Sequence, residues 1–380
     1  MLARLRFTAG LAVVITIIAL VIGLSLKLRT NPVAPQERIS NNSESTTVVV
    51  KATSKGSSVL EYANLTQSQK PADNNHLDLL KGQLLSTAEM AMLDSLPFSE
   101  VRDVKLLGNR VLLATAGGVV EFYADDSSFS LYSEPQGLTT YNSYALLDDG
   151  EDIFVGTSHG VYHISGIGIV SPIWGEISDT VTVLKKFGEQ IYVGTRTDGL
   201  YVITGDTIDQ ILNGKSITAL TKNQFGLWVG TKEDGLLFSD GNSWRKCYLK
   251  RDSTLFANVT ALESGYGRMW VGTTNGVFEY NGGAWTPIDS AANLYDQDVT
   301  AIAVGMKYIY FGTANSGVFC YDGAISPLDW TQNLQVRSLD VDSGNYLVGT
   351  AKHGATLKTK KGEYEVLPLI RQTSGILSGI

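Results

Sequence analysis

Histidines that could carry protons or bind a metal stand within three residues after a recurring Gly-Thr pair. Two of the chain's four histidines, His159 and His353, stand there, and each is followed at once by a glycine. Imidazole serves as a general acid, a general base or a metal ligand. If the repeats form a ring, His159 and His353 could share one site. The alternative is that both are ordinary solvent-facing turn residues.

The same turns in the other repeats carry charged and amide side chains of both signs. Polar side chains that converge at the mouth of a central channel are a usual place for a ligand. The alternative is the hydrophilic chemistry of any exposed turn, and the mixed charges do not indicate one class of ligand. The predicted ligand-binding residues are His159, Arg196, Asp198, Lys232, Glu233, Asn275, Asn315, Lys352 and His353.

Sequence motifs for catalysis and for metal binding are missing. The chain contains no His-x-Glu, Glu-x-x-His or Cys-x-x-Cys pairing, which argues against a transition-metal site. It also lacks a nucleophile elbow, a phosphate loop and a dinucleotide fingerprint. The acidic run 148–152 could bind Ca²⁺, but it lacks the alternating oxygen spacing of a calcium loop and fits a turn between strands. We therefore predict a protein that is not an enzyme and that uses no cofactor and no metal.

Charge and cysteine content narrow the partners. The formal net charge is −8, which argues against a nucleic-acid partner held by phosphate attraction. Residues 245–251 hold four cations; we expect a solvated outer strand there, with contact to anionic lipid or an acidic partner as the alternative. Cys247 and Cys320 fall in different repeats, so we expect two buried, inert thiols and no disulfide.

A pattern of about 40 residues recurs seven times and defines the elements that hold these turns. Each copy alternates apolar and polar residues with period 2 and is rich in valine, isoleucine and aromatic residues, which is typical of strands. An upstream strand such as 259–262 and a downstream strand such as 283–288 complete a unit of four. The motif threonines are Thr115, Thr157, Thr195, Thr231, Thr273, Thr313 and Thr350.

Four-stranded sheets arranged radially around an axis cover both faces of every sheet and leave only short edges. The sequence therefore predicts an all-β fold, a seven-bladed β-propeller over 97–370. The glycine before each threonine would let neighbouring blades approach closely, and the threonine hydroxyl would satisfy a turn amide. We expect each blade to be continuous in sequence, although the segment before Val101 or the tail after Arg371 could add a closing strand.

The repeat resembles the two-component regulator propeller family, most closely over 137–162 and 256–277. The resemblance covers about 270 residues. It implies a periplasmic sensor domain of a membrane-bound bacterial hybrid histidine kinase. The family's following β-sandwich, second membrane span and kinase do not follow the last repeat here, so we expect no signalling through a kinase in the same chain.

The N-terminus predicts a membrane anchor. Residues 7–26 carry no charged side chain, and as a helix they would span about 30 Å, the hydrocarbon thickness of a bilayer. We predict an uncleaved signal anchor with its short basic tail in the cytoplasm; a cleaved signal peptide and a buried soluble helix are the alternatives.

The rest of the N-terminal region changes composition twice. Residues 30–75 are rich in serine, threonine, asparagine and glutamine, which indicates a disordered linker. A capping-box pattern predicts a short helix near 86–95. The predicted organisation is a cytoplasmic tail and transmembrane helix (1–29), the linker (30–75), a packing segment (76–96), the propeller (97–370) and a C-terminal tail (371–380).

These features together predict a single-pass protein of the inner (cytoplasmic) membrane, with its propeller on the periplasmic or extracellular side. We expect it to bind a protein partner as a scaffold or assembly factor. The alternative is a sensor that binds a small molecule and signals through a separate partner. Enzymatic activity is the less favoured third hypothesis.

Overall fold

The computed structural model describes residues 98–124, 129–140, 142–150, 152–251, 253–288, 294, 297–360 and 362–366, together with two short strands nearer the N-terminus. Those two strands, β1 (Ser45–Val48) and β2 (Ala63–Thr66), pair with each other within the predicted linker. The predicted anchor at 7–26, the predicted helix at 86–95 and the C-terminal tail lie outside the described residues. Among the described residues, no helix is long and apolar enough to cross a bilayer.

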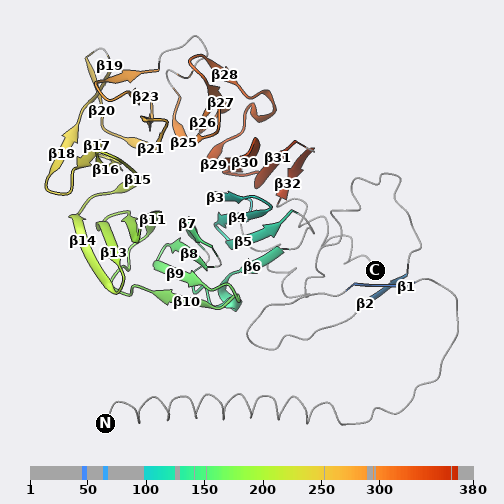
Figure 1. Cartoon of the computed structure of the whole chain (residues 1–380). Coiled ribbons are helices and arrows are strands. Elements are labelled where there is room, and N and C mark those ends of the chain that lie inside the picture. Colours follow the sequence, from blue (N-terminus) through green and yellow to red (C-terminus); the bar gives the residue numbers. More distant parts are fainter. Residues whose placement is uncertain are drawn as a thin grey trace, which may run out of the picture. The chain divides into compact units, whose positions relative to one another are not determined.

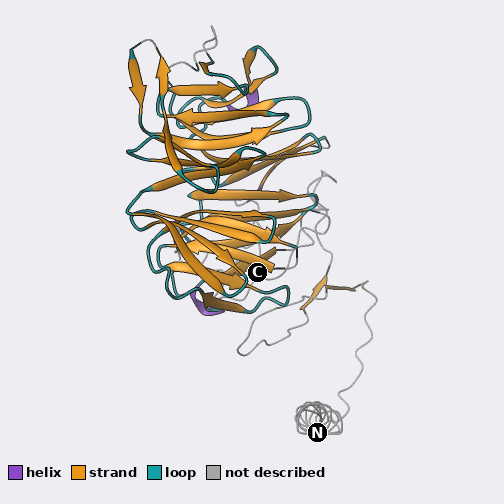
Figure 2. Cartoon of the chain, turned by 60° about the vertical axis from the view of Figure 1, so that its left-hand side comes forward, coloured by secondary structure: helices purple, strands orange, loops and turns teal. Residues whose placement is uncertain are grey.

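The prediction of a seven-bladed, all-β propeller is confirmed. Seven four-stranded antiparallel sheets follow one another along the chain, and every sheet keeps its four strands in sequence order. They stand around a common centre (Figure 1) and stack as a disc when seen from the side (Figure 2). Two 3₁₀ turns, η1 (Glu134–Gln136) and η2 (Asp329–Thr331), lie in the connections between blades.

The first strand of each blade lies nearest the centre of the ring (Figure 1). These inner strands are β3 (Val101–Leu107), β7 (Ser143–Asp149), β11 (Val181–Phe187), β15 (Ile217–Asn223), β21 (Val259–Gly265), β25 (Val299–Val304) and β29 (Val336–Asp342). The second strands end on the motif threonine: β4 (Arg110–Thr115), β8 (Asp152–Thr157), β12 (Gln190–Thr195), β16 (Gly226–Thr231), β22 (Arg268–Thr273), β26 (Ile309–Thr313) and β30 (Asn345–Thr350).

The third and fourth strands complete each blade toward the rim. The third strands are β5 (Gly118–Tyr123), β9 (Gly160–Ile164), β13 (Gly199–Thr204), β17 (Leu236–Ser239), β23 (Gly276–Tyr280), β27 (Gly317–Tyr321) and β31 (Ala355–Thr359). The fourth strands are β6 (Phe129–Tyr132), β10 (Val170–Ile173), β14 (Thr207–Asn213), β18 (Trp244–Cys247), β24 (Trp285–Pro287), β28 (Ile325–Pro327) and β32 (Gly362–Glu365). An extra hairpin, β19 (Leu249–Arg251) and β20 (Thr254–Phe256), stands between the fourth and fifth blades.

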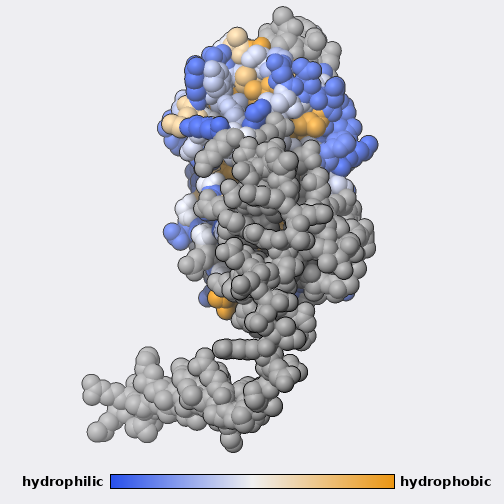
Figure 3. All heavy atoms as spheres, turned by 90° about the vertical axis from the view of Figure 1, so that its right-hand side faces the viewer, coloured by the Kyte–Doolittle hydropathy of each residue, from blue (hydrophilic) through white to orange (hydrophobic). Residues whose placement is uncertain are grey.

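The hydrophobic core is divided among the gaps between blades. Seven apolar clusters are present, and each takes its residues from two neighbouring blades, the pair of the last and first blades included. Seen from the side (Figure 3), the described surface is mostly hydrophilic, with small separate hydrophobic spots. Burial between blades thus stabilises the ring as a whole, as expected for stacked repeats.

The motif glycine and threonine have the structural roles that the sequence predicts. A Cβ built on Gly194 would stand 2.6 Å from Ile217, the first residue of the next inner strand, so only glycine lets the blades approach this closely. All seven motif threonines are 1% exposed or less. Each hydroxyl donates to a carbonyl across the following turn and accepts an N–H from it, as Thr157 does with Gly160 at 3.0 Å and His159 at 3.1 Å.

The two ends of the ring carry different connections. The turn after each motif threonine lies at one end of its blade, beside the start of the inner strand, and we call this end the upper face. The hairpin between the first and second strands lies at the opposite end, which we call the lower face. The second residue of an inner strand is hydrogen-bonded to the first residue of the next inner strand in the third, fourth and sixth blades. Neighbouring inner strands therefore start at the same level, and each face gathers the same connection from every blade.

The ring closes by packing of the last blade on the first, and every described blade is continuous in sequence, as predicted. Ser338 in β29 donates its hydroxyl hydrogen bond to Asp103 in β3 at 3.0 Å and accepts the Val104 N–H at 3.1 Å. Asp340 accepts the N–H of Leu106 at 2.8 Å. Side-chain hydrogen bonds therefore join strands more than 200 residues apart in sequence, without an exchanged strand among the described residues.

Candidate functional site

The predicted site residues all stand in the turns of the upper face, in six of the seven blades. In every such turn the side chain at the tip is exposed, including His159, Arg196, Lys232, Asn275 and Lys352. Among the described residues, no hydrogen bond or ion pair joins any two of the nine predicted residues. The structure therefore places them on one face but does not assemble them into one cluster, and a shared site for His159 and His353 stays a prediction.

An arginine–tyrosine group forms at the upper mouth of the central channel, and sequence reasoning missed most of it. The Arg102 guanidinium lies 4.1 Å from the ring centroid of Tyr144, and the guanidinium of Arg196 lies 5.2 Å from the same centroid. Glu100 accepts the Arg102 Nε hydrogen bond at 2.9 Å, and Asn142 accepts one from Nη1 at 3.1 Å. We call Arg102, Tyr144 and Arg196 the mouth group.

A break in the repeat is the sequence feature from which the mouth group could have been predicted. The second residue of the inner strand is threonine in four consecutive blades, and each hydroxyl donates to the first carbonyl of the next inner strand. For example, the distances from Thr182 to Ile217 and from Thr218 to Val259 are both 2.6 Å. The other three blades have Arg337, Arg102 and Tyr144 there. Those three blades are neighbours across the ring closure.

Asp298 precedes the inner strand of the sixth blade and is an unusual carboxylate on this face. Its Oδ1 is buried and has no hydrogen-bond partner among the described residues. Burial raises the pKa of Asp298, and the positive charge of Arg337 opposes that rise. Asp179, in contrast, accepts N–H groups from Thr180, Thr197 and Asp198, which lower its pKa although burial acts to raise it.

Charged side chains also meet inside the ring. Lys185 and Glu263 form an ion pair at 3.2 Å between the inner strands of the third and fifth blades. The charge of Glu263 raises the pKa of Lys185 despite burial. Lys105 pairs with Asp103 at 3.3 Å in the first blade. These groups are matched in charge, and the Lys185–Glu263 pair joins the inner strands of two different blades.

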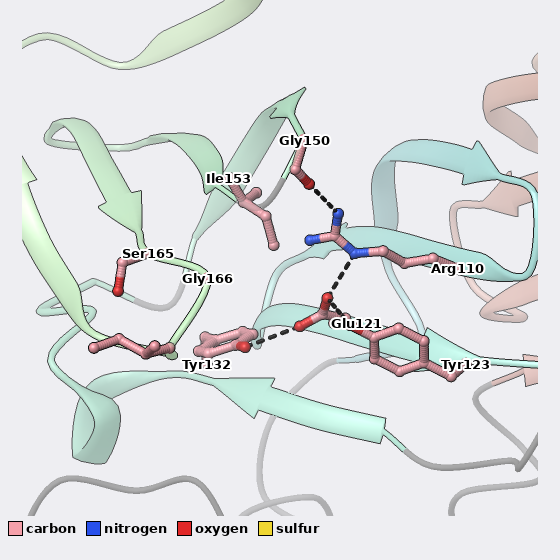
Figure 4. Close-up of a pocket in the computed structure, with 9 residues that line it drawn as sticks. Arg110, Glu121, Tyr123, Tyr132, Gly150, Ile153, Ser165 and Gly166 are labelled. Carbon is pink, nitrogen blue, oxygen red and sulfur yellow. Dashed lines mark hydrogen bonds and ion pairs between the residues drawn. The ribbon is translucent and has the colours of Figure 1, made fainter.

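A pocket of about 460 Å³ opens between the first and second blades toward the lower face (Figure 4). The side chain of Glu121 is 7% exposed and accepts hydrogen bonds from Arg110 Nε at 2.6 Å, Tyr123 at 2.8 Å and Tyr132 at 2.9 Å. Arg110 Nη1 also donates to Asp148 at 2.7 Å. In Figure 4 the remaining guanidinium nitrogen carries no drawn interaction and points toward Ile153.

The electrostatics of this pocket follow from one buried carboxylate. Burial raises the pKa of Tyr132, and the charge of Glu121 raises it further. Burial would lower the pKa of Arg110, but the hydrogen bond and the charge of Glu121 outweigh it and raise that pKa. Tyr132 and Arg110 therefore stay protonated and keep donating their hydrogen bonds to the Glu121 carboxylate.

The fifth blade repeats the pair in a more open setting. Arg268 and Glu279 occupy the positions equivalent to Arg110 and Glu121, and Arg268 Nη1 donates to Glu279 at 2.8 Å. The arginine is 54% exposed there, against 15% in the first blade. The adjoining pocket is only about 180 Å³. The first-blade pocket is thus the larger version of a repeated feature, and its arginine is the more buried of the two.

The acidic run and the two cysteines are the other chemical features that the sequence singles out. Asp148 and Asp149 of the acidic run pair with Arg110 and Lys186 at 2.7 Å each, and no group of three metal-ligating side chains occurs among the described residues. Cys247 and Cys320 are free, as predicted, but only half-buried. Burial raises the pKa of Cys247.

The basic run 245–251 only partly follows its prediction. Arg245 and Lys246 are exposed on the outer strand β18, as expected. Arg251 is instead 5% exposed. Its guanidinium lies 5.5 Å from the Phe256 ring centroid and donates to the Asn275 carbonyl at 3.2 Å. The hairpin β19–β20 causes the difference, because it folds this residue back against the fifth blade.

Comparison with solved structures identifies similar propellers. The extracellular domain of the hybrid two component system BT4673 from B. thetaiotaomicron is 17% identical, with a TM-score of 0.57 over 68% of this chain and 38% of that one. YCF48 bound to D1 peptide is 11% identical, with a TM-score of 0.55 over 70% of this chain and 91% of that one. Streptogramin B lyase is 16% identical, with a TM-score of 0.53 over 68% of this chain and 93% of that one.

These likenesses establish the fold and nothing finer. No family model matches the chain, and no curated protein sequence matches it. The similar structures include an extracellular domain of a hybrid two component system, a peptide-bound protein and a lyase. The predicted family resemblance therefore has support at the level of the propeller alone, where the extracellular domain of a hybrid two component system is among the similar structures.

Proposed function

We propose that this protein is a membrane-anchored, exported propeller that binds a protein partner as a scaffold or assembly factor. The mouth group is the single observation that carries the proposal. Tyrosine and arginine are, with tryptophan, the residue types enriched at the energetic centres of protein interfaces. Here three such side chains, from three successive blades, stack at the channel mouth.

The order within the mouth group supports a preformed binding surface. Glu100 and Asn142 fix the Arg102 guanidinium under the Tyr144 ring. A side chain that is already ordered loses less conformational entropy when a partner binds. Peptide binding by a similar propeller, YCF48 bound to D1 peptide, agrees with a protein partner.

The location is proposed from the sequence. An uncharged segment at 7–26 long enough for a bilayer supports a single-pass anchor in the inner membrane, with the propeller exported. Deleting residues 1–29 should move the protein from the membrane fraction to the soluble fraction of the cell. Retention of the truncated protein in the membrane fraction would contradict the anchor.

The partner is tested by photocrosslinking from the upper face in the source cells. A benzoylphenylalanine at His159 stands in the second blade, beside the mouth group, and one at Asn315 stands in the equivalent turn of the sixth blade. We expect one protein to be captured from position 159 and little from position 315. The Tyr144→Ala change should weaken capture at least about tenfold, because interface aromatics contribute that much or more. Absence of any captured protein at both positions would refute the proposal.

Solute sensing is the second candidate, and the first-blade pocket favours it. A volume of about 460 Å³ lies in the range of small-molecule sites, and a guanidinium nitrogen of Arg110 faces into it. Screening solutes by thermal shift separates the two functions, because a ligand that binds only the folded form raises the melting temperature. A shift that disappears in Arg110→Met but persists in Arg268→Met would assign sensing to this pocket.

A further inference from the structure

The lower face carries a row of exposed apolar side chains on three successive blades. Phe225, Tyr266 and Met306 stand at the tips of the hairpins of the fourth, fifth and sixth blades. They are 54%, 66% and 85% exposed. We call these three residues the apolar arc. Large apolar side chains gathered at one place mark interaction surfaces, whereas scattered ones do not.

Hydrogen bonds join the three hairpins into one surface. Thr221 and Ser264 share a hydrogen bond of 2.9 Å between the fourth and fifth blades. The Tyr266 hydroxyl donates to the Gly305 carbonyl at 2.6 Å, next to Met306 in the sixth blade. These contacts therefore hold the three hairpins of the arc side by side on the lower face.

The charge on the arc has one sign. The hairpins 222–226, 265–268 and 305–308 contain Lys222, Arg268 and Lys307 and no carboxylate. Lys307 is fixed beside its own hairpin, where its Nζ donates to the Tyr308 hydroxyl at 2.8 Å. Arg268 shares its charge with Glu279, which leaves the two lysines as the main positive charges.

The rest of the lower face has the opposite charge. The hairpins of the second, third and seventh blades carry an acidic arc. The cations among them are Lys186, Arg110 from the first blade, and Lys360, whose Cε lies 3.6 Å from the Cβ position at Gly344. The carboxylates of the acidic arc are Asp148, Asp149, Asp152, Glu189 and Asp342. A partner that covered the whole face would meet both signs of charge. A partner confined to the apolar arc meets mainly cations and apolar side chains, with Asp322, whose charge acts on Lys307, as a nearby carboxylate.

From this pattern we infer that the apolar arc docks an acidic polypeptide segment with large apolar side chains, on the face opposite the mouth group. A flat anionic bilayer fits less well, because the acidic arc on the same face would be brought against the lipid phosphates. The inference rests on the proposed function to the extent that both need a protein partner. It adds a second surface, which would let the propeller hold two segments at once.

Photocrosslinking from the lower face tests this inference in the full-length chain. Benzoylphenylalanine at Phe225 and at Tyr266 should both capture one protein segment rich in Asp and Glu and in Leu, Phe or Trp. Position Ile167, which is 76% exposed but lies outside the arc in the second blade, is the matched control and should capture little. The captured segment is then read by mass spectrometry of the crosslinked peptide.

The contribution of charge to docking is measured from the binding of a synthetic peptide with the sequence of the captured segment. The double change Lys222→Glu and Lys307→Glu should weaken its binding to the full-length protein at least about tenfold, and added salt should weaken binding to the unchanged protein. Lys246→Glu, which reverses an exposed charge on β18, should change binding less than about twofold.

Three results would overturn the inference. They are capture of lipid only from Phe225 and Tyr266, capture of a segment without acidic residues, or no capture from either position. If His159 still captures a protein in these cases, the proposed function stands and only the second surface is lost. If no position on either face captures a protein, both proposals fail.

Discussion

The propeller contains two kinds of junction between blades. From the third to the seventh blade, each junction repeats one design, in which a glycine receives the first residue of the next inner strand and a threonine hydroxyl bonds that residue's carbonyl. Around the ring closure, arginine or tyrosine stands at the threonine position, and carboxylates accept the hydrogen bonds between blades. Asp103 alone bonds to Ser338 of the seventh blade and to the Leu146 N–H of the second blade.

The difference lies at the junctions where the repeat pattern is broken in this sequence. A junction between blades adjacent in sequence is formed by a chain that is already held close, whereas the closing junction joins residues more than 200 positions apart. Closing so long a loop costs more entropy, so charge-assisted hydrogen bonds are a reasonable addition there. The same three blades that depart from the repeat also supply Arg102 and Tyr144 of the mouth group.

The largest expected loss of stability comes from replacing the motif glycine of a repeated junction by a larger residue. Gly194→Val places its Cβ 2.6 Å or less from both Ile217 and Val183, so the blades must separate. We expect the free energy of unfolding to fall by about 3 kcal/mol or more, measured by chemical denaturation. Gly175→Val, at an exposed glycine with no atom within 4 Å of its Cβ position, should change it by less than about 0.5 kcal/mol.

The closing junction should be more sensitive than a repeated one to loss of its polar side chain. Asp103→Ala leaves the Leu146 N–H and the Ser338 hydroxyl without their acceptor, and we expect a loss of about 2 kcal/mol in the free energy of unfolding. Thr218→Val at a repeated junction removes one neutral hydrogen bond and should cost about 1 kcal/mol. Equal costs would show that the closing junction has no special role.

Most of the fold, but little of the site, could be predicted from the sequence. The repeat fixes four strands per blade, seven blades and the roles of the Gly-Thr pair, because each is a local pattern that recurs. The group of Arg102 with Tyr144 joins different repeats, and only the geometry of the ring brings them together. The apolar arc was missed for the same reason, since Phe225, Tyr266 and Met306 each look like one ordinary hairpin residue in its own repeat.

The junction between the first and second blades offers a sharper comparison, because both of its contacting residues differ from those of the repeated design. Ala114 stands where the other blades have the motif glycine, and Ser143 stands where the other inner strands begin with valine or isoleucine. The Ser143 hydroxyl is buried without a hydrogen-bond partner among the described residues. A larger residue on one side is thus matched by a smaller one on the other.

A double-mutant cycle tests this compensation. Ser143→Val alone should lower the free energy of unfolding by about 1–2 kcal/mol, because its methyl groups meet the Cβ of Ala114. Adding Ala114→Gly should recover most of that loss by restoring the standard junction, a coupling measured from the four proteins by denaturation. Additive effects, with no recovery in the double variant, would show that the two positions are independent.

The smallest expected effect is a pH dependence at the closing junction. Burial raises the pKa of Asp340, and the Leu106 N–H and the charge of Lys105 oppose that rise. Because the folded-state pKa lies above the unfolded one, the folded protein keeps a proton that the unfolded chain has lost between the two values. Asp340 therefore stabilises the fold less as pH rises from its ordinary pKa of 3.8 through the folded value.

Comparison with Asp340→Asn isolates this contribution, because the amide does not titrate. The stability of the unchanged protein relative to Asp340→Asn should decline as the pH rises above about 4 and level off once Asp340 is ionised in the folded protein. The slope for a single proton is at most about 1.4 kcal/mol per pH unit. Thr300→Val, at the repeated junction between the sixth and seventh blades, should show no such slope relative to the unchanged protein, since no carboxylate is removed. A relative stability of Asp340→Asn that is flat with pH would mean that the closing junction leaves Asp340 with the pKa it has in the unfolded chain.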